Sequence, residues 1–357
     1  MLEVFLAQQT NPVKTLVVDD TAFMRRALVE ILSRDPDIEV VGVAKHGREA
    51  LEAIEVLDPD VITLDVDMPV MDGLTAIKHI MVRGPKPIIM VSGLAGHGRV
   101  TFEALKLGAV DFFPKPSGTI SPDMERRADE LGRVVKQAAR LNPRGIVRAR
   151  LPHQEENETA VPQQLMGVVV VAAQRGTSSN LIKLLSHVSS SLPLSIIALQ
   201  DISLQVLESY SAELDRSVSW TVNTNQDCSL AGGDCLLSSM KNPWHFRKGG
   251  DGNIHVAKGQ KRGTDDFFRE AALYMGSRCL AVVLGGENDD GVSGLVHVRE
   301  KGGGVLVLEP GACVYGEASR AVLEAGAGES IPSEPELWRK VETFGRRLLL
   351  ESLSAVK

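Results

Sequence analysis

The chain has 357 residues, of which 43% are apolar, 24% charged and 4% aromatic, and at roughly 100–200 residues per domain this length predicts two domains. Its formal net charge of −7 argues against the broad basic surface that binding to nucleic acid or anionic lipid requires. Because no apolar run approaches the roughly 20 residues of a membrane span, we also expect no membrane insertion.

The first part of the chain alternates short apolar runs with segments of helical period. The predicted strands are Lys14–Val18, Glu39–Val43, Val61–Leu64, Ile88–Val91 and Ala109–Phe113, and the predicted helices include Ala22–Leu32 and Arg48–Val56. This alternation is typical of βαβ units and of a parallel sheet covered on both faces. A last helix, with Ser121 as N-cap and Pro122 at its first position, completes a domain predicted to span residues 14–141.

Residues 142–164 carry prolines and clustered charges without an apolar period, which predicts an exposed linker. A second α/β domain is predicted over residues 165–352. Its expected strands are Val168–Ala172, Leu194–Leu199, Ser217–Val222, Leu280–Leu284 and Gly304–Leu308. The four cysteines lack C-x-x-C spacing and Met1–Thr10 has no basic segment of a signal peptide, so we expect reduced thiols in a cytoplasmic protein.

Polar residues that can bind ions or react lie at the ends of four predicted strands of the first domain. Asp19 and Asp20 follow the first strand, Asp65 follows the third, Ser92 the fourth and Lys115 the fifth. In a parallel α/β sheet such groups gather outside the carboxyl ends of the strands. Three neighbouring carboxylates repel one another and favour a hard divalent cation such as Mg²⁺, which leaves one of them as a nucleophile for a phosphoryl group.

With this set of residues, positions 14–140 resemble a response-regulator receiver domain, a flavodoxin-like fold with a five-stranded parallel sheet. The resemblance implies that Asp65 is the phosphoacceptor and that Asp19, Asp20, Asp65 and the main-chain carbonyl of Asp67 hold Mg²⁺. It further implies that Ser92 and Lys115 contact the phosphoryl group as the switch pair. Phe112, three residues before Lys115, is placed to change its packing when Ser92 moves.

Several segments of the second domain resemble the chemotaxis methylesterases of the CheB type. Val282-Val283-Leu284-Gly285-Gly286, followed by Asp290-Gly291, is similar to their Leu-Thr-Gly-Met-Gly-x-Asp-Gly segment, and Val314-Tyr315-Gly316 is similar to their Val-Tyr-Gly-Met-Pro region. The resemblance implies a second doubly wound α/β domain. It also implies a Ser, His and Asp triad that hydrolyses receptor glutamyl methyl esters or deamidates receptor glutamines.

The sequence departs from that family at two of the three triad positions. The family's Gly-Ala-Ser-Thr-Gly-Gly segment is replaced by Ala172-Ala173-Gln174-Arg175-Gly176-Thr177, so that Gln174 stands at the nucleophile position. Asp201 stands where the family has histidine, and Asp290 alone matches. An amide is no usable nucleophile and a carboxylate is a weaker base than imidazole, and losing one triad member costs on the order of 10⁴–10⁶ in rate. Glu287 also adds negative charge where an oxyanion would form.

Other residues could rescue hydrolysis. Ser178 and Ser179 follow Gln174 by about one helical turn and His187 lies further along the same helix, although capping and solvation explain all three. Asp201 paired with Asp290 or Glu287 could activate water. His245 and His255 flank a glycine-rich stretch and are interpreted as hairpin or loop residues rather than metal ligands.

We therefore expect a response regulator that a chemosensory histidine kinase phosphorylates on Asp65 and whose second domain acts by binding a chemoreceptor or a related signalling protein. Whether the chain is an enzyme stays open at this point. A working protein-glutamate methylesterase/protein-glutamine glutaminase with a non-standard residue set is the alternative, and a phosphate sink in which only the receiver matters is a third possibility.

Overall fold

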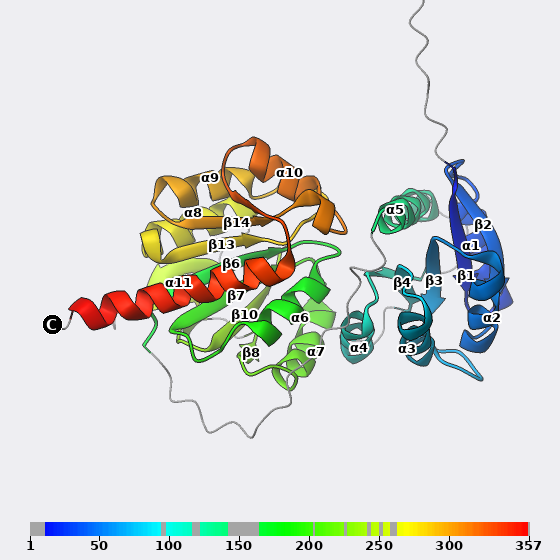
Figure 1. Ribbon diagram of the computed structural model, residues 1–357, viewed down its shortest axis with the longest axis horizontal. Coiled ribbons are helices and arrows are strands. Elements are labelled where there is room, and N and C mark those ends of the chain that lie inside the picture. The colour runs from blue at the N-terminus through cyan, green and yellow to red at the C-terminus, as the bar shows by residue number, and fades with distance from the viewer. Residues whose placement is uncertain are drawn as a thin grey trace, which may run out of the picture. The chain divides into compact units, whose positions relative to one another are not determined.

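The computed structural model describes residues 11–93, 98–115, 122–141, 164–202, 204–224, 227–240, 244–249, 253–257 and 263–355. The chain divides into two compact units, one built on a five-stranded sheet and the other on a seven-stranded sheet (Figure 1). Among the described helices, none combines the length and apolar character needed to traverse a bilayer.

Residues 13–139 alternate strands and helices along the chain. In order, the elements are β1 (Val13–Val18), α1 (Ala22–Leu32), β2 (Ile38–Ala44), α2 (Gly47–Leu57), β3 (Val61–Asp65), α3 (Gly73–Arg83), β4 (Ile88–Ser92), α4 (Gly98–Leu107), β5 (Asp111–Pro114) and α5 (Pro122–Ala139). The strands are parallel in the order β2-β1-β3-β4-β5. The predicted five-stranded parallel sheet is confirmed.

Successive side chains along the strands point to opposite faces of this sheet, and apolar side chains are buried on both faces. Val17, Ile89 and Val91 pack under α1 and α5, whereas Leu16 and Val18 point to the opposite face, the side on which α2 and α3 pack together. The apolar stripe predicted for the last helix is buried at Leu131, Val134, Val135 and Ala138. The predicted N-cap Ser121 lies outside the described residues.

The second unit is also doubly wound. Its elements are β6 (Gly167–Ala173), α6 (Ser178–His187), β7 (Leu194–Gln200), α7 (Leu204–Asp215), β8 (Thr221–Asn223), β9 (Cys228–Ser229), β10 (Asp234–Ser239), β11 (His245–Lys248), β12 (Ile254–Ala257), α8 (Thr264–Met275), β13 (Cys279–Val283), α9 (Val292–Glu300), β14 (Gly304–Leu308), α10 (Glu317–Glu324), β15 (Glu329–Ile331) and α11 (Glu334–Ala355). Seven parallel strands run in the order β15-β14-β13-β6-β7-β10-β8. Helices α6, α7 and α11 cover one face of this sheet, and α8, α9 and α10 cover the other (Figure 1). Val169 and Val171 pack with the first group of helices, and Val168 and Val170 pack with the second.

One sequence prediction for this unit was wrong, and some of its strands were missed. The strand predicted at Ser217–Val222 begins only at Thr221, because Val218 and Trp220 reach the core from a turn. Strand β10 was not predicted, and of the three-stranded antiparallel sheet, in the order β11-β12-β9, only a hairpin or loop around His245 and His255 was expected. The limits 14–141 and 165–352 stay predictions, and nearly all of the linker 142–164 lies outside the described residues.

Candidate functional site

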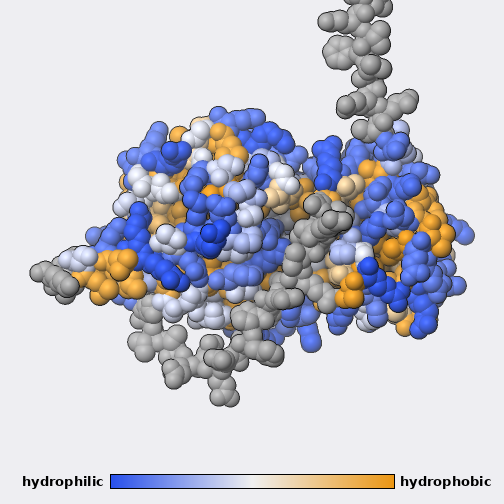
Figure 2. Space-filling view, in the orientation of Figure 1, coloured by the Kyte–Doolittle hydropathy of each residue, from blue (hydrophilic) through white to orange (hydrophobic). Residues whose placement is uncertain are grey.

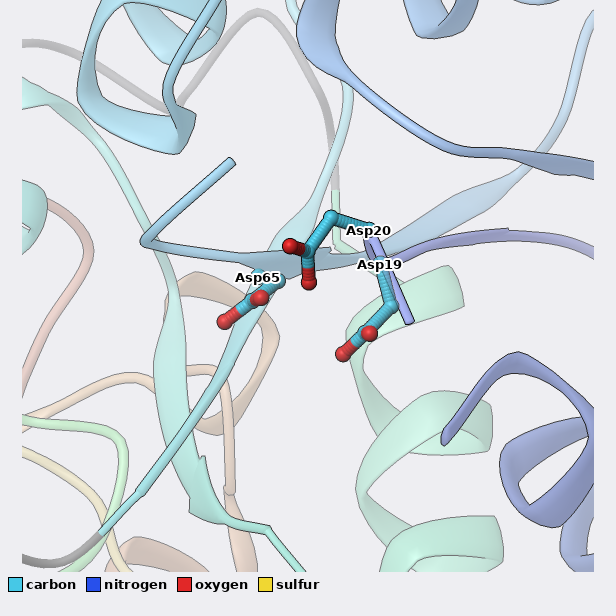
Figure 3. A group of neighbouring side chains, drawn as sticks. All are labelled: Asp19, Asp20 and Asp65. Atoms are coloured by element: carbon cyan, nitrogen blue, oxygen red, sulfur yellow. The ribbon is translucent and has the colours of Figure 1, made fainter. Parts of the chain in front are cut away.

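Three carboxylates meet at the carboxyl edge of the five-stranded sheet. Asp19 and Asp20 follow β1, and Asp65 ends β3. These two strands are neighbours, and the order in which successive strands are added to the sheet reverses between them. One oxygen from each lies within 4.8 Å of the others (Figure 3). Asp19 and Asp65 are 0% and 3% exposed, whereas Asp20 is exposed to solvent. Clustered oxygen donors at an edge that solvent reaches fit a hard divalent cation.

The loop that carries the acidic pair is held from two sides. Thr21 is the N-cap of α1 and also donates from its backbone N and its Oγ1 to Asp19 Oδ1, at 2.9 and 2.8 Å. Arg25 Nη1 donates to the backbone carbonyls of Asp19 and Asp20, at 2.8 and 2.9 Å. Sequence reasoning missed both supports. A threonine before an amphipathic helix signals a cap, but nothing in the sequence signals the Arg25 contacts.

Lys115 ties two of the carboxylates together. Its Nζ lies 2.9 Å from Asp19 Oδ2 and 2.7 Å from Asp65 Oδ2. Burial raises the pKa of Asp65 against the opposing effect of Lys115. Burial alone would lower the pKa of Lys115, but its bonds to Asp19 and Asp65 raise it. The site therefore combines a desolvated carboxylate with a firmly protonated lysine.

The remaining predicted residues lie around this cluster. The backbone N of Lys115 donates to the carbonyl of Ser92 at 2.8 Å, and Ser92 is 2% exposed at the end of β4. Phe112 is half-buried and pairs with Met90 between β5 and β4. Asp67 is exposed, two residues after Asp65. The structure thus gathers Asp19, Asp20, Asp65 and Lys115 beside Ser92, while the roles of Phe112 and Asp67 stay predictions.

A cleft of about 190 Å³ lies at the carboxyl edge of the seven-stranded sheet, where strand order reverses between β6 and β13. It brings together all three predicted triad positions. The cleft is lined by Gln174, Arg175, Asp201, Met240, Glu287, Asn288 and Asp290. These residues come from the loops that follow β6, β7, β10 and β13.

Gln174 is built into the wall of the cleft. It is 4% exposed, and its amide exchanges long hydrogen bonds of 3.4 Å with the backbone of Asn288 in both directions. Gly286 has a φ of +145°, and a Cβ there would overlap the Gln174 side chain. The glycine loop and the glutamine therefore fit one another.

The acidic members of the cleft have other partners. Asp290 Oδ2 accepts from Thr264 Oγ1 at 2.7 Å, and Asp201 is exposed after the end of β7. The negative charge of Glu287 is partly offset by Arg175, whose Nε lies 3.9 Å from Glu287 Oε1. Among the described residues that line the cleft, none is serine, cysteine or histidine.

The serines and the histidine weighed as substitutes lie outside the lining of the cleft. Ser178 is outside the cleft lining and donates to Gln200 Oε1 at 3.3 Å. His187 ends α6, about 13 Å of helix from its first residue, and its Nδ1 contacts the carbonyl of Lys183. His245 and His255 lie in β11 and β12, which pair antiparallel, so the hairpin interpretation is confirmed. The four cysteines are free thiols.

Fold and acidic cluster together define a response regulator whose receiver is joined to a second α/β domain. The family model of the response regulator receiver domain matches residues 15–121, and that of the CheB methylesterase matches residues 169–340. The chain belongs to the family of CheB-type protein-glutamate methylesterases.

Relatives cover nearly the whole chain. A protein-glutamate methylesterase/protein-glutamine glutaminase 2 of Carboxydothermus hydrogenoformans is 33% identical over 354 residues, covering 90% of this chain and 96% of that protein. The corresponding protein of Geobacillus kaustophilus is 34% identical, covering 89% and 95%. Among solved structures, the response regulator domain of Thermotoga maritima CheB is 47% identical and covers 37% of this chain and all of that one, with a TM-score of 0.35.

Proposed function

We propose that this chain is a phosphorylation-controlled regulator of a chemosensory pathway whose methylesterase-type domain binds a partner instead of hydrolysing glutamyl esters. The observation that carries the proposal is the buried Gln174 amide, seated against Gly286 at the nucleophile position of the cleft. Acyl transfer needs a nucleophile with a removable proton and a base within hydrogen-bond reach. Gln174 has no such proton to lose, and the carboxylate of Asp201, which lines the same cleft, is a weaker base than imidazole.

In the receiver, Asp65 is the proposed phosphoacceptor. One of its carboxylate oxygens attacks the phosphorus of the donor's phosphohistidine, the N–P bond breaks, the imidazole leaves, and the new O–P bond makes an acyl phosphate. Asp19, Asp20, Asp65 and the carbonyl of Asp67 would hold Mg²⁺, for which the oxygen donors within 4.8 Å are suited. When bound, the ion supplies positive charge that offsets the charge of the phosphoryl oxygens. A chemosensory histidine kinase is the proposed phosphodonor.

Two residues would then respond to the new phosphoryl group. Lys115, now shared between Asp19 and Asp65, would pair with one phosphoryl oxygen, and the Ser92 hydroxyl would donate to another. Because β4 and β5 are neighbours, a shift of Ser92 would reach Phe112 on the adjacent strand. We propose this as the route by which phosphorylation alters the surface of the receiver.

Phosphorylation is tested by labelling with acetyl phosphate and Mg²⁺. The wild-type chain should acquire one phosphoryl group that is base-labile and hydroxylamine-sensitive, as an acyl phosphate is, and Asp65→Asn should not. Asp67→Asn is the matched control, because it removes a nearby exposed carboxylate while keeping the main-chain carbonyl. Persistent labelling of Asp65→Asn would defeat the assignment of the phosphoacceptor.

Binding is tested with the soluble cytoplasmic fragment of a methylated chemoreceptor from the same organism. The phosphorylated chain should bind this fragment more tightly than the unphosphorylated one, and Gln174→Trp, which fills the cleft, should weaken binding. Trp substitution at the exposed Leu273 on α8 controls for bulk alone. Equal affinity of the wild-type and Gln174→Trp proteins would remove the cleft from the proposal.

The alternative function is a working methylesterase or glutaminase with a non-standard residue set, which the names of the relatives favour. In that case a carboxylate pair, Asp201 with Asp290 or Glu287, would activate water, or Ser178 or Ser179 would carry an acyl group. Asp290→Ala would then abolish ester hydrolysis. Mass spectrometry of protein quenched during turnover would show an acyl adduct on one of the two serines if they acted as nucleophiles.

A further inference from the structure

The cleft of the second unit carries an excess of negative charge. It is lined by the three carboxylates of Asp201, Glu287 and Asp290, and Arg175 is the one basic side chain among the described residues of its lining. Asp201 and Asp290 are exposed, and carboxylates that water reaches are ionised at neutral pH. Arg175 Nε lies 3.9 Å from Glu287 Oε1. Because one guanidinium compensates one carboxylate, the cleft as a whole attracts a cation.

Two of these carboxylates stand where the chain departs from the CheB-type pattern. Asp201 stands at the position of the triad histidine, and Glu287 stands at the methionine of the Leu-Thr-Gly-Met-Gly-x-Asp-Gly segment. A glutamyl ester or a glutamine amide is neutral, so added negative charge does not help the cleft to hold either. Losing the nucleophile alone would have ended acyl transfer. The added carboxylates therefore indicate a different ligand.

The spacing of the carboxylates favours an organic cation over a metal ion. Within the described ranges, Asp19, Asp20 and Asp65 are the one set of three acidic, histidine or cysteine side chains whose ligand atoms all lie within 4.8 Å of one another. The carboxylates of the cleft are therefore spread more widely than three ligands of a single ion. A guanidinium carries its charge on a planar fork of N–H donors, so it can contact separated acceptors at once.

The lining also matches the stem and the head of one long basic side chain. At about 190 Å³ the cleft is smaller than the roughly 300–1,000 Å³ of small-molecule sites. Met240 supplies apolar surface for a methylene stem. Gln174 is 4% exposed, and its Oε1 accepts a long bond of 3.4 Å from the backbone N of Asn288. An amide oxygen has two lone pairs, so this buried acceptor can take a further donor.

We propose that the cleft binds an arginine side chain of the partner protein, with its guanidinium toward Asp201 and Asp290 and its stem along Met240. The inference rests on the proposed function, because it names the group by which the partner is held. Lysine concentrates its charge on one nitrogen and should bind more weakly. Hydrophilic colour predominates on the face of the second unit that Figure 2 shows, and a partner that is held through a charged side chain suits such a surface.

Methyl NMR of the full chain with ¹³C-labelled methionine tests the proposal, because Met240 lines the cleft. The probe is the blocked peptide acetyl-Ala-Ala-Arg-Ala-Ala-amide, titrated with and without acetyl phosphate and Mg²⁺. The Met240 signal, assigned with Met240→Leu, should shift saturably, and the affinity should fall as salt is raised. The same peptide with neutral citrulline in place of arginine should leave the signal unmoved, and a lysine peptide should bind several-fold more weakly.

Two matched substitutions test the role of the carboxylates. Asp201→Asn should weaken binding of the arginine peptide at least about threefold, because it removes one exposed charge of the lining. Asp289→Asn is the control and should leave the affinity unchanged, because Asp289 is exposed next to Asp290 but is not among the described lining residues. Circular dichroism verifies that both variants are folded. Equal weakening by the two substitutions would overturn the proposal in favour of general attraction by negative charge.

A peptide with glutamate γ-methyl ester in place of arginine separates this inference from the proposed function. If this peptide shifted Met240 without being hydrolysed and the arginine peptide did not shift it, the arginine assignment would fall and the proposed function would stand. Release of methanol from the ester peptide would overturn the proposed function and the inference with it. An arginine peptide that leaves Met240 unmoved, both with and without acetyl phosphate and Mg²⁺, would overturn the inference alone.

Discussion

Replacing Lys115 by methionine should destabilise the receiver when no divalent cation is present. The substitution keeps the apolar stem but removes the charge that bonds Asp19 at 2.9 Å and Asp65 at 2.7 Å. Breaking a buried ion pair costs about 3–5 kcal/mol. Because the Lys115 side chain is 20% exposed and Asp65 can take up a proton, we expect a loss of about 2–3 kcal/mol. For a receiver-sized domain this corresponds to roughly 10 °C in melting temperature.

The assay can separate the two domains, because Trp220, Trp244 and Trp338 all lie outside the receiver match at 15–121. A far-UV circular dichroism melt in EDTA should show an earlier transition that tryptophan fluorescence does not follow. Saturating Mg²⁺ should reduce the difference in receiver melting temperature between Lys115→Met and wild type, because the ion replaces the missing positive charge.

The matched control is Lys86→Met, which removes the 2.6 Å pair with Asp58. The Asp58 side chain is 83% exposed, so the shift should be much smaller. The electrostatic reasoning would be refuted if Lys115→Met and wild type had the same melting temperature in EDTA. It would also be refuted if Mg²⁺ left the difference between their melting temperatures unchanged.

Three further substitutions probe the two sites. Burial holds the pKa of Asp65 in the folded state above its unfolded value, so ionisation of this carboxyl lowers the free energy of unfolding as pH rises above about 4. Asp65→Asn should therefore raise the melting temperature of the receiver at neutral pH in EDTA and make it depend less on pH. A melting temperature with the same pH dependence as wild type would contradict the direction of the pKa shift. Arg25→Ala should weaken Mg²⁺ binding several-fold, as measured by calorimetry, because it removes the bonds that hold the backbone of Asp19 and Asp20. Arg26→Ala, at an exposed position of α1, should leave Mg²⁺ affinity unchanged. Equal effects of the two substitutions would show that the loss of one positive charge, and not the loop contact, changes the affinity. Gly286→Ala should lower the free energy of unfolding by about 1–3 kcal/mol, because the added methyl group overlaps Gln174. In a double-mutant cycle measured by chemical denaturation, adding Gln174→Ala should recover part of that loss. Strictly additive effects of the two substitutions would argue against the contact.

The receiver was predictable because its inner strands β3 and β4 are buried along their whole length. Val61–Leu64 is fully apolar apart from Thr63, and every residue of it is buried, so the strand appears as a continuous run in the sequence. The strand-end rule then located Asp19, Asp65 and Lys115 together. The contacts of Arg25 with two backbone carbonyls could not be predicted, because they depend on the path of a loop rather than on a repeat.

The second domain was harder because burial and strand character diverge there. Strand β10 has a short apolar run followed by Ser238 and Ser239, which are 1% and 2% exposed, so its pattern looks too polar for a central strand. Trp220 misled in the opposite direction, since it is buried from a turn and bonds the carbonyl of Val188 at 2.9 Å. The resemblance to the CheB-type segments located Gln174, Asp201 and Asp290, but the bond of Asp290 to Thr264 emerged only with the fold.

Methanol release from a methylated chemoreceptor fragment tests the absence of esterase chemistry most directly. The phosphorylated wild-type chain should release methanol at the rate of the protein-free blank at every protein concentration. Release that rises in proportion to wild-type protein, and that Asp290→Ala abolishes while the fold is kept, would contradict the account.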